Sequence, residues 1–188
     1  MTDATSAIGD MTPLQQPDLI KQAVGYCSHQ ASKGIDSLVA LMQRTGDDWK
    51  RCLDGVSETQ ADFSPAKGEW TTKEVVTHFL TTTGGVNDQI RKLTRGEDVG
   101  QLAPGGPDQR PTETPSVPEL SAETVAIFDE IADLTRALEG NGNLGKQFPH
   151  PAFGQLDILQ WIAFQRLHGM DHMQQIEKNK ADAGYPKA

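Results

Sequence analysis

Cysteine is scarce in this sequence, and both long apolar runs and an excess of basic charge are missing. The 188 residues include two cysteines, Cys27 and Cys52, outside any C-x-x-C spacing. Neither a disulfide framework nor a thiolate zinc site is expected, and both cysteines are interpreted as reduced structural thiols. No apolar stretch is long enough to span a bilayer. The formal charge of -9 opposes attraction to nucleic acid and to anionic lipid. We therefore expect neither nucleic acid nor a membrane as a partner.

The N-terminus has no positively charged segment followed by an apolar one, so we expect a cytoplasmic protein. Hydrophobic residues make up 36% of the chain and charged residues 23%, a balance typical of a soluble globular domain. A chain of this length suits one domain with a sizeable core. We expect a loose arm over residues 1–30, with one or two helical turns after Pro17 that pack on the rest of the protein or on a second subunit. A helical domain is expected over residues 31–180.

Four segments place apolar residues at a spacing near three and a half residues, which marks one stripe of a helix. These stripes run over residues 35–52, 75–93, 120–138 and 161–176. No strand pattern of comparable quality appears, so the sequence predicts an all-α four-helix bundle. Residues 95–118 contain five prolines and cannot form a regular helix. This stretch is predicted to be a long crossover between the second and third helices.

Two of the helix starts are well marked. Thr71 and Glu74 form an S/T-x-x-E capping box before the second helix, and Asp157 stands in the same relation to Gln160 before the fourth. Hydrophobic staples are expected at the same two starts, formed by Trp70 with Val75 and by Leu156 with Trp161. The three tryptophans, Trp49, Trp70 and Trp161, are therefore interpreted as core and staple residues rather than as a substrate cage.

Three histidines are candidates for a metal site. His168 and His172 are four residues apart, so on a helix their imidazoles project from the same face and can reach one ion. Their stripe is the buried one, where two imidazoles cost free energy unless each finds a partner, and a cation satisfies both. Because an H-x-x-x-H spacing often arises by chance, ordinary surface or core histidines remain an alternative for this pair. His78, on the inner half of the second helix, is the candidate for the third ligand that a metal site needs.

Other polar residues near these positions are weaker candidates. Asp171 lies about a hundred degrees around the helix from the histidine pair, so it is expected to face a neighbour or solvent, with a lesser option of assisting the site. Gln165 and Gln175 share the inner stripe and could orient a ligand or a water, although buried amides bonded to backbone are the more common outcome. His150 is expected to pack a loop before the fourth helix. His29 lies in the N-terminal arm and matches no known motif.

Two stretches of the sequence resemble a known family. They are GEWTTKEVVTHF, residues 68–79, and HPAFGQLDILQWIAFQRLHGMDHMQQI, residues 150–176. A helix that starts at Trp-Ser/Thr and carries a histidine, followed later by a helix with H-x-x-x-H and then Gln-Ile, resembles the pattern of the DinB-like (DinB/YfiT) superfamily of four-helix-bundle metalloenzymes. The resemblance covers roughly residues 32–178.

This resemblance implies that His78, His168 and His172 are the metal ligands, because they stand at the positions of the family's histidines. It also implies a four-helix bundle with a long crossover between the second and third helices, and a homodimer. Characterised relatives include transferases and isomerases that use the low-molecular-weight thiols mycothiol or bacillithiol. The resemblance is informative about the fold and the site rather than about the reaction.

Three protein ligands leave coordination positions open, as in catalytic rather than structural metal sites. A divalent ion there lowers the pKa of a bound water or thiol and so produces a nucleophile at neutral pH. Zinc and nickel suit imidazole best, and the spacing does not separate them from iron, cobalt or manganese. The leading hypothesis is a metal-dependent enzyme that transfers a thiol to a small-molecule substrate or hydrolyses one. A non-catalytic stress-response bundle that binds a metal or ligand, and a metal-free bundle, remain alternatives.

Overall fold

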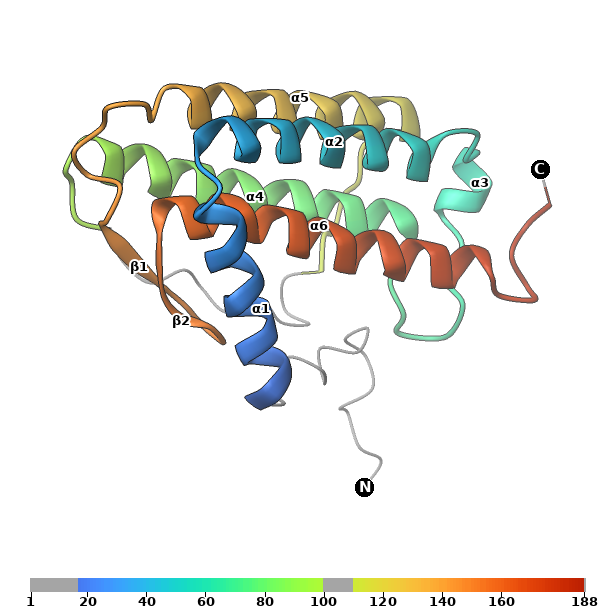
Figure 1. Ribbon diagram of the computed structural model, residues 1–188. Coiled ribbons are helices and arrows are strands. Elements are labelled where there is room, and N and C mark those ends of the chain that lie inside the picture. The colour runs from blue at the N-terminus through green and yellow to red at the C-terminus, as the bar shows by residue number, and fades with distance from the viewer. Residues whose placement is uncertain (1–16, 100–109, 188) are drawn as a thin grey trace.

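The computed structural model describes residues 17–99 and 110–187. The helices are α1 (Pro17–Ala31), α2 (Ile35–Leu53), the short α3 (Glu58–Ala61), α4 (Thr72–Thr94), α5 (Val117–Arg136) and α6 (Ile158–Lys180). Two short strands, β1 (Gln147–His150) and β2 (Gly154–Asp157), precede α6. The four long helices α2, α4, α5 and α6 lie side by side as a bundle (Figure 1). Helices α2 and α4 each pack between α5 and α6. The predicted four-helix bundle is confirmed.

Helices α4 and α5 run in the same direction, which requires a long connection (Figure 1). Near their starts, the Val117 backbone N–H donates to Oε1 of Glu58 in α3 (2.8 Å), and Glu58 is paired with Lys73 in the first turn of α4. Near their ends, the side-chain amide of Asn143 donates to the carbonyl of Thr94 (3.1 Å). A chain that leaves α4 at one end of the bundle must therefore return to the other end to begin α5. The predicted crossover is confirmed, although its residues 100–109 lie outside the described part.

The returning end of the crossover is fixed to the start of α4 by Arg110. The guanidinium of Arg110 donates to both carboxylate oxygens of Glu74, at 2.7 and 2.8 Å, and to the backbone carbonyls of Gly68 and Glu69. Glu74 also accepts from the Thr71 backbone N–H (2.8 Å) as part of the predicted capping box. One carboxylate thus caps α4 and holds the end of the crossover, because a bidentate arginine–carboxylate pair is strongly directional.

The hairpin before α6 was not expected from the sequence. Strands β1 and β2 pair antiparallel, with Phe148 opposite Leu156 and His150 opposite Gly154. Each strand has four residues, too few to show a clear alternation of apolar and polar side chains. The hairpin is stabilised by α6, since the buried ring of Phe148 stacks on Trp161 with centroids 4.2 Å apart. Tertiary packing rather than local strand propensity therefore forms these strands.

Helix α1 is longer than the one or two turns expected in the N-terminal arm. It has 15 residues and packs against α6 (Figure 1). The fully buried Cys27 joins the main core, and the side-chain amide of Gln160 at the start of α6 donates to the hydroxyl of Ser28 (2.9 Å). The described part of the arm thus packs on the bundle. The remainder of the arm, residues 1–16, lies outside the described residues.

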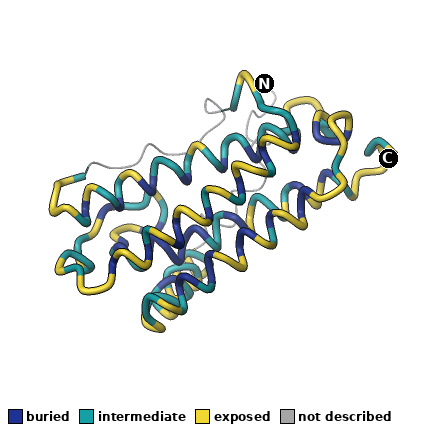
Figure 2. The backbone as a smooth tube through the Cα atoms, turned by 90° about the horizontal axis from the view of Figure 1, so that it is seen from above, coloured by how far each residue is buried: buried dark blue, intermediate teal, exposed yellow. Residues whose placement is uncertain are grey.

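Aromatic rings fill the centre of the bundle. Phe79 of α4 stacks on Trp49 of α2, with centroids 4.6 Å apart, and on Phe128 of α5, at 5.8 Å. Helix α6 approaches this stack at Gly169, where a Cβ atom would lie 2.9 Å from Trp49 Nε1. Figure 2 shows buried positions on the sides of the helices that face one another. The apolar stripes that predicted the helices therefore meet in one core.

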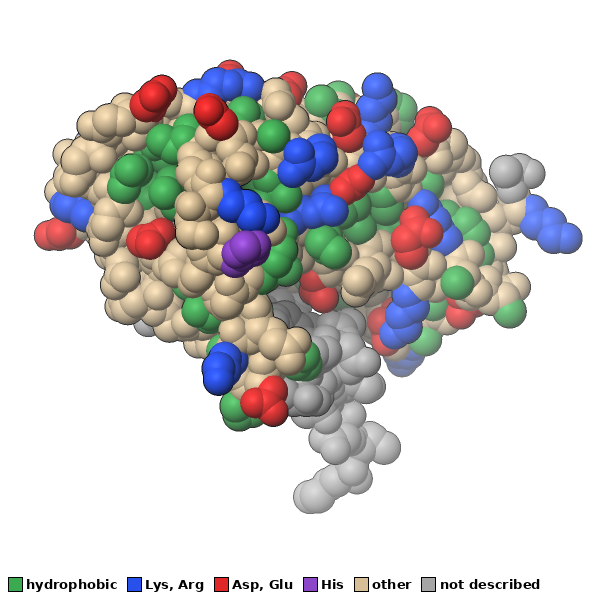
Figure 3. Space-filling model, in the orientation of Figure 1, with side chains coloured by type: hydrophobic (Ala, Val, Ile, Leu, Met, Phe, Trp, Pro, Cys, Tyr) green, Lys and Arg blue, Asp and Glu red, His purple; other side chains and the backbone are tan. Residues whose placement is uncertain are grey.

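The outer surface is mixed in charge. Figure 3 shows acidic and basic side chains interspersed over one face of the protein. Several of them form ion pairs, such as Lys73 with Glu58 (2.7 Å) and with Asp62 (2.8 Å). In the parts of the chain that the structure describes, none of the helices combines the length and the apolar character needed to cross a bilayer.

Candidate metal centre

Helices α4 and α6 run antiparallel, and their packing brings the three predicted histidines together. The end of α6 is tied to the start of α4, where the side-chain amide of Asn179 donates to the carbonyl of Trp70 (2.8 Å). His78 lies in the second turn of α4, opposite His168 and His172 in the middle of α6. One ring nitrogen from each histidine lies within 4.8 Å of the other two. These three side chains therefore form a group that could hold a metal ion.

The spacing of the donor atoms suits one ion. Nε2 of His168 and Nε2 of His172 are 3.0 Å apart. Two nitrogens that each lie about 2.0–2.1 Å from the same ion are separated by about 3 Å when the angle between the bonds is near 90°, and by slightly more at a tetrahedral angle. The ring of His78 lies 5.5 Å from that of His172, centroid to centroid, so the third donor approaches from the α4 side. The donor set therefore fits a divalent metal ion with positions left open.

Gln175 orients the ring of His172. Its Oε1 atom lies 3.4 Å from Nδ1 of His172, and an amide oxygen can only accept a hydrogen bond. This contact favours the tautomer of His172 with its proton on Nδ1, in which the lone pair of Nε2 can bind an ion. Metal-binding histidines commonly have such a partner on the second nitrogen, and it fixes both the tautomer and the ring orientation.

Aromatic side chains surround the three histidines. Trp70, which lies just before α4, meets His78 edge to face with centroids 5.0 Å apart. This tryptophan therefore contacts the site. On the inner side, Phe79 lies 5.3 Å from His168 and 5.9 Å from His172. Phe164, one turn before His168 on α6, stacks on it at 5.5 Å. All three histidines are half-buried.

Burial keeps the imidazoles of His168 and His172 neutral. Burial lowers the pKa of His168 well below its ordinary value, and the neighbouring His172, His78 and His150 add to this effect. Burial, and then His78, lower the pKa of His172 to about 4, against a small opposing effect of Gln175. A neutral imidazole is the form that binds a metal, so these rings are ready to act as ligands at pH 7 without first losing a proton.

The other sequence candidates lie outside this group. Asp171 is exposed on α6, as its position on the helix predicted. His29 is exposed on α1. Gln165 is fully buried, and neither polar atom of its side-chain amide has a hydrogen-bond partner in the described part of the chain. It therefore lacks the backbone bond that is common for buried amides. Trp49 and Trp161 belong to the core, as predicted.

His150 lies closer to the metal centre than the sequence indicated. It ends β1, and its Nδ1 atom accepts hydrogen bonds from the backbone N–H groups of Ala152 (3.0 Å) and Phe153 (3.2 Å). Its ring lies 4.7 Å from that of Phe164, which in turn stacks on His168. Burial lowers the pKa of His150 to about 4. His150 thus packs the loop, as expected, and it also contacts the aromatic side chains beside His168. The sequence did not indicate this second contact because the hairpin was not recognised.

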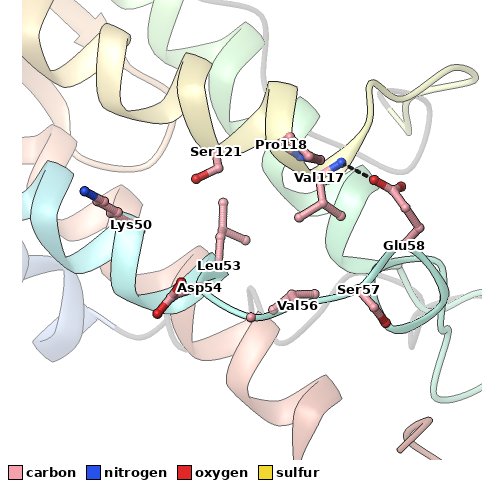
Figure 4. A pocket seen from close by; sticks show the side chains of 10 residues that line it. Lys50, Leu53, Asp54, Val56, Ser57, Glu58, Val117, Pro118 and Ser121 are labelled. Atoms are coloured by element: carbon pink, nitrogen blue, oxygen red, sulfur yellow. Dashed lines mark hydrogen bonds between the residues drawn. The ribbon is translucent and has the colours of Figure 1, made fainter. Parts of the chain in front are cut away.

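A surface cavity of about 410 Å³ lies elsewhere on the bundle (Figure 4). The C-terminal end of α2, the loop to α3 and the start of α5 form its walls, with Lys50, Asp54 and Glu58 as its charged residues. Glu58 is engaged there with the Val117 backbone N–H, as the dashed line shows. None of the three histidines lines this cavity, so it is separate from the metal centre.

Comparison with known proteins supports the fold and identifies the family. No curated protein matches this sequence. Among solved structures, YfiT from Bacillus subtilis, described as "a probable metal-dependent hydrolase with an unusual four-helix bundle topology", superposes with a TM-score of 0.61 and 14% sequence identity. The match covers 81% of this chain and 89% of that chain. The model of the DinB superfamily matches residues 41–176, a span that includes all three histidines. The chain therefore belongs to the DinB superfamily.

Proposed function

We propose that this protein is a metal-dependent enzyme that acts on a small molecule, with His78, His168 and His172 holding one divalent ion. The observation that carries the proposal is the convergence of three imidazoles from two helices, with one nitrogen of each within 4.8 Å of the others. Burial that keeps the rings neutral, and the contact of Gln175 with His172, support the same role. The description of YfiT as a probable metal-dependent hydrolase adds support at the level of the fold.

The bound ion would lower the pKa of a water or a low-molecular-weight thiol and so supply a nucleophile. The protein's own contribution is to present three imidazole donors from α4 and α6 and to leave the remaining coordination positions open. Trp70, Phe79 and Phe164 shield the site from water on their sides. Zinc or nickel suits these ligands best, and iron, cobalt or manganese is also compatible with imidazole. The proposed enzyme is a homodimer in the cytoplasm and uses a low-molecular-weight thiol as its co-substrate.

The metal content of the purified protein tests the site directly. We expect about one divalent ion per chain after purification without chelators, as three ligands from one chain require. His172→Ala should lose the ion and keep its helical circular dichroism signal, because the aromatic core rather than the ion stabilises the bundle. His29→Ala, which removes an exposed histidine from α1, should keep the ion. Wild-type protein without stoichiometric metal, and without a thermal shift on adding zinc or nickel, would contradict the proposal.

Turnover separates an enzyme from a bundle that only binds metal. The metal-loaded protein would be incubated with electrophilic small molecules in water alone and with low-molecular-weight thiols. Product formation that disappears in His172→Ala supports catalysis at the ion. If metal binds stoichiometrically and no combination gives product, the non-catalytic metal-binding bundle becomes the better explanation.

A further inference from the structure

The hairpin fixes the tautomer of His150. Its Nδ1 accepts from the backbone N–H groups of Ala152 and Phe153, at 3.0 and 3.2 Å. A ring nitrogen that accepts hydrogen bonds carries no proton, so in the neutral ring the proton is on Nε2. Burial lowers the pKa of His150 to about 4, which makes the neutral ring the form present at pH 7. His150 therefore presents one N–H donor, at Nε2, on the side away from the hairpin backbone.

This donor lies in aromatic surroundings. The ring of His150 stacks on Phe153 at 4.3 Å and contacts Phe164 at 4.7 Å and Trp161 at 5.3 Å, centroid to centroid. In the described part of the chain, Nε2 has no hydrogen-bond acceptor. His150 is half-buried, and a hydrogen bond made beside these aromatic rings is stronger than one made in water.

His150 and the metal centre share one aromatic wall. The ring centroid of Phe164 lies 4.7 Å from that of His150 and 5.5 Å from that of His168. The distance between the two histidine centroids therefore cannot exceed the sum of these two distances. A molecule a few atoms long, bound to the ion at one end, would be long enough to reach His150.

We propose that His150 Nε2–H donates a hydrogen bond to an oxygen acceptor, preferably a carboxylate, on the small molecule bound at the open position of the metal. The inference rests on the proposed function and adds a substrate class to it: a compound with a carboxylate a few atoms from the group that meets the ion. A carboxylate is preferred because a hydrogen bond to an ionised acceptor is roughly twice as strong as one between neutral groups. His150 acts here as a positioning residue.

Thiol ligands of graded length test this geometry. The full-length protein would be loaded with Co²⁺, whose visible absorption changes when a thiol binds. Mercaptoacetate, 3-mercaptopropionate and longer ω-mercaptocarboxylates would then be titrated beside alkanethiols of matched length. At one chain length we expect the carboxylate to bind about 10-fold more tightly than the alkanethiol, as for a hydrogen bond to a charged group. The absence of this preference at every length would overturn the inference.

Two variants separate the donor from the hairpin. In His150→Asn, the side-chain oxygen can still accept from the backbone N–H groups of Ala152 and Phe153, as in an Asx turn, but the distant donor is lost. This variant should stay folded and bind Co²⁺, with a lower unfolding temperature because the packed ring is lost, and it should lose the carboxylate preference. His150→Gln carries an N–H donor near the position of Nε2, so it should retain part of the carboxylate preference.

An unchanged carboxylate preference in His150→Asn would mean that His150 acts only within the hairpin. If the wild-type protein itself takes up no Co²⁺, the proposed function fails, and the inference fails with it. If Co²⁺ binds and the preference is absent, the inference alone is wrong.

Discussion

Neutral imidazoles define the candidate centre at the scale of single residues. His168 and His172 face each other through Nε2 atoms 3.0 Å apart, a contact that two charged rings would oppose. The sequence identified both, and His78, from position alone, because helical spacing and the apolar stripe place them on an inner face. It offered Gln175 as a residue that could orient a ligand but favoured a backbone-bonded amide, since the rotamer that brings its Oε1 atom to Nδ1 of His172 cannot be read from spacing.

Replacing Gln175 tests the orientation of His172. Gln175→Leu removes the acceptor for Nδ1–H, so the tautomer and the ring angle are no longer fixed. We expect metal affinity to fall by about 10- to 100-fold, the usual cost of losing such a partner. Gln174→Leu changes the exposed neighbour and should leave affinity unchanged. Competition titration with a chelating dye measures the metal affinity of each variant. Equal affinities of the two variants would show that Gln175 does not orient a metal ligand.

The stability of the metal-free protein should depend on pH in a defined window. The pKa of His172 is lowered from 6.5 to about 4 in the folded state, so the unfolded chain binds more protons between these values. Stability is therefore lost as pH falls from 6.5 towards 4, up to a limit of about 3 kcal/mol for this residue. Urea denaturation of metal-free protein at a series of pH values measures the loss. His172→Gln should reduce the slope, and a flat wild-type profile would contradict the account.

Helices and strands differed in how well the sequence predicted them. The apolar stripes predicted α2, α4, α5 and α6. The capping boxes at Thr71 and Asp157 predicted where α4 and α6 begin. These signals are local, so they can be read without knowledge of the fold. The hairpin and the full length of α1 were missed because both depend on α6. Phe148 stacks on Trp161, and Ser28 accepts from Gln160.

Gly169 allows α6 to approach α2 beside the metal centre. Gly169→Ala would place a Cβ atom 2.9 Å from Trp49 Nε1, so the helices must separate or the indole must turn. We expect a loss of about 1–3 kcal/mol in the free energy of unfolding, as for other overpacked cores, together with weaker metal binding.

Gly85→Ala is the matched control, because a Cβ atom at this position in α4 meets nothing within 4 Å. It should stabilise the protein by about 0.5–1 kcal/mol through the better helix propensity of alanine. Urea denaturation of both variants measures the two effects. If Gly169→Ala is as stable as Gly85→Ala, close approach of α6 to Trp49 is not required.

The site as a whole depends on how α4 and α6 align. The sequence placed each histidine on an inner face, but nothing in it fixed which turn of α4 would lie opposite which turn of α6. In the structure the alignment is set by contacts such as that of Asn179 with the carbonyl of Trp70, and by the Phe79 ring packed against both His168 and His172. From the sequence, only the family resemblance indicated that His78 pairs with His168 and His172. In the structure, helix packing brings the three histidines together independently of that resemblance.

Anomalous diffraction from crystals of the metal-loaded protein would test the convergence of the three histidines most directly. Data collected at the absorption edge of the bound metal should show one strong peak per chain, about 2.0–2.2 Å from Nε2 of His168, Nε2 of His172 and a ring nitrogen of His78. A peak coordinated by other residues, or one that His168 and His172 bind while His78 points away, would contradict the account.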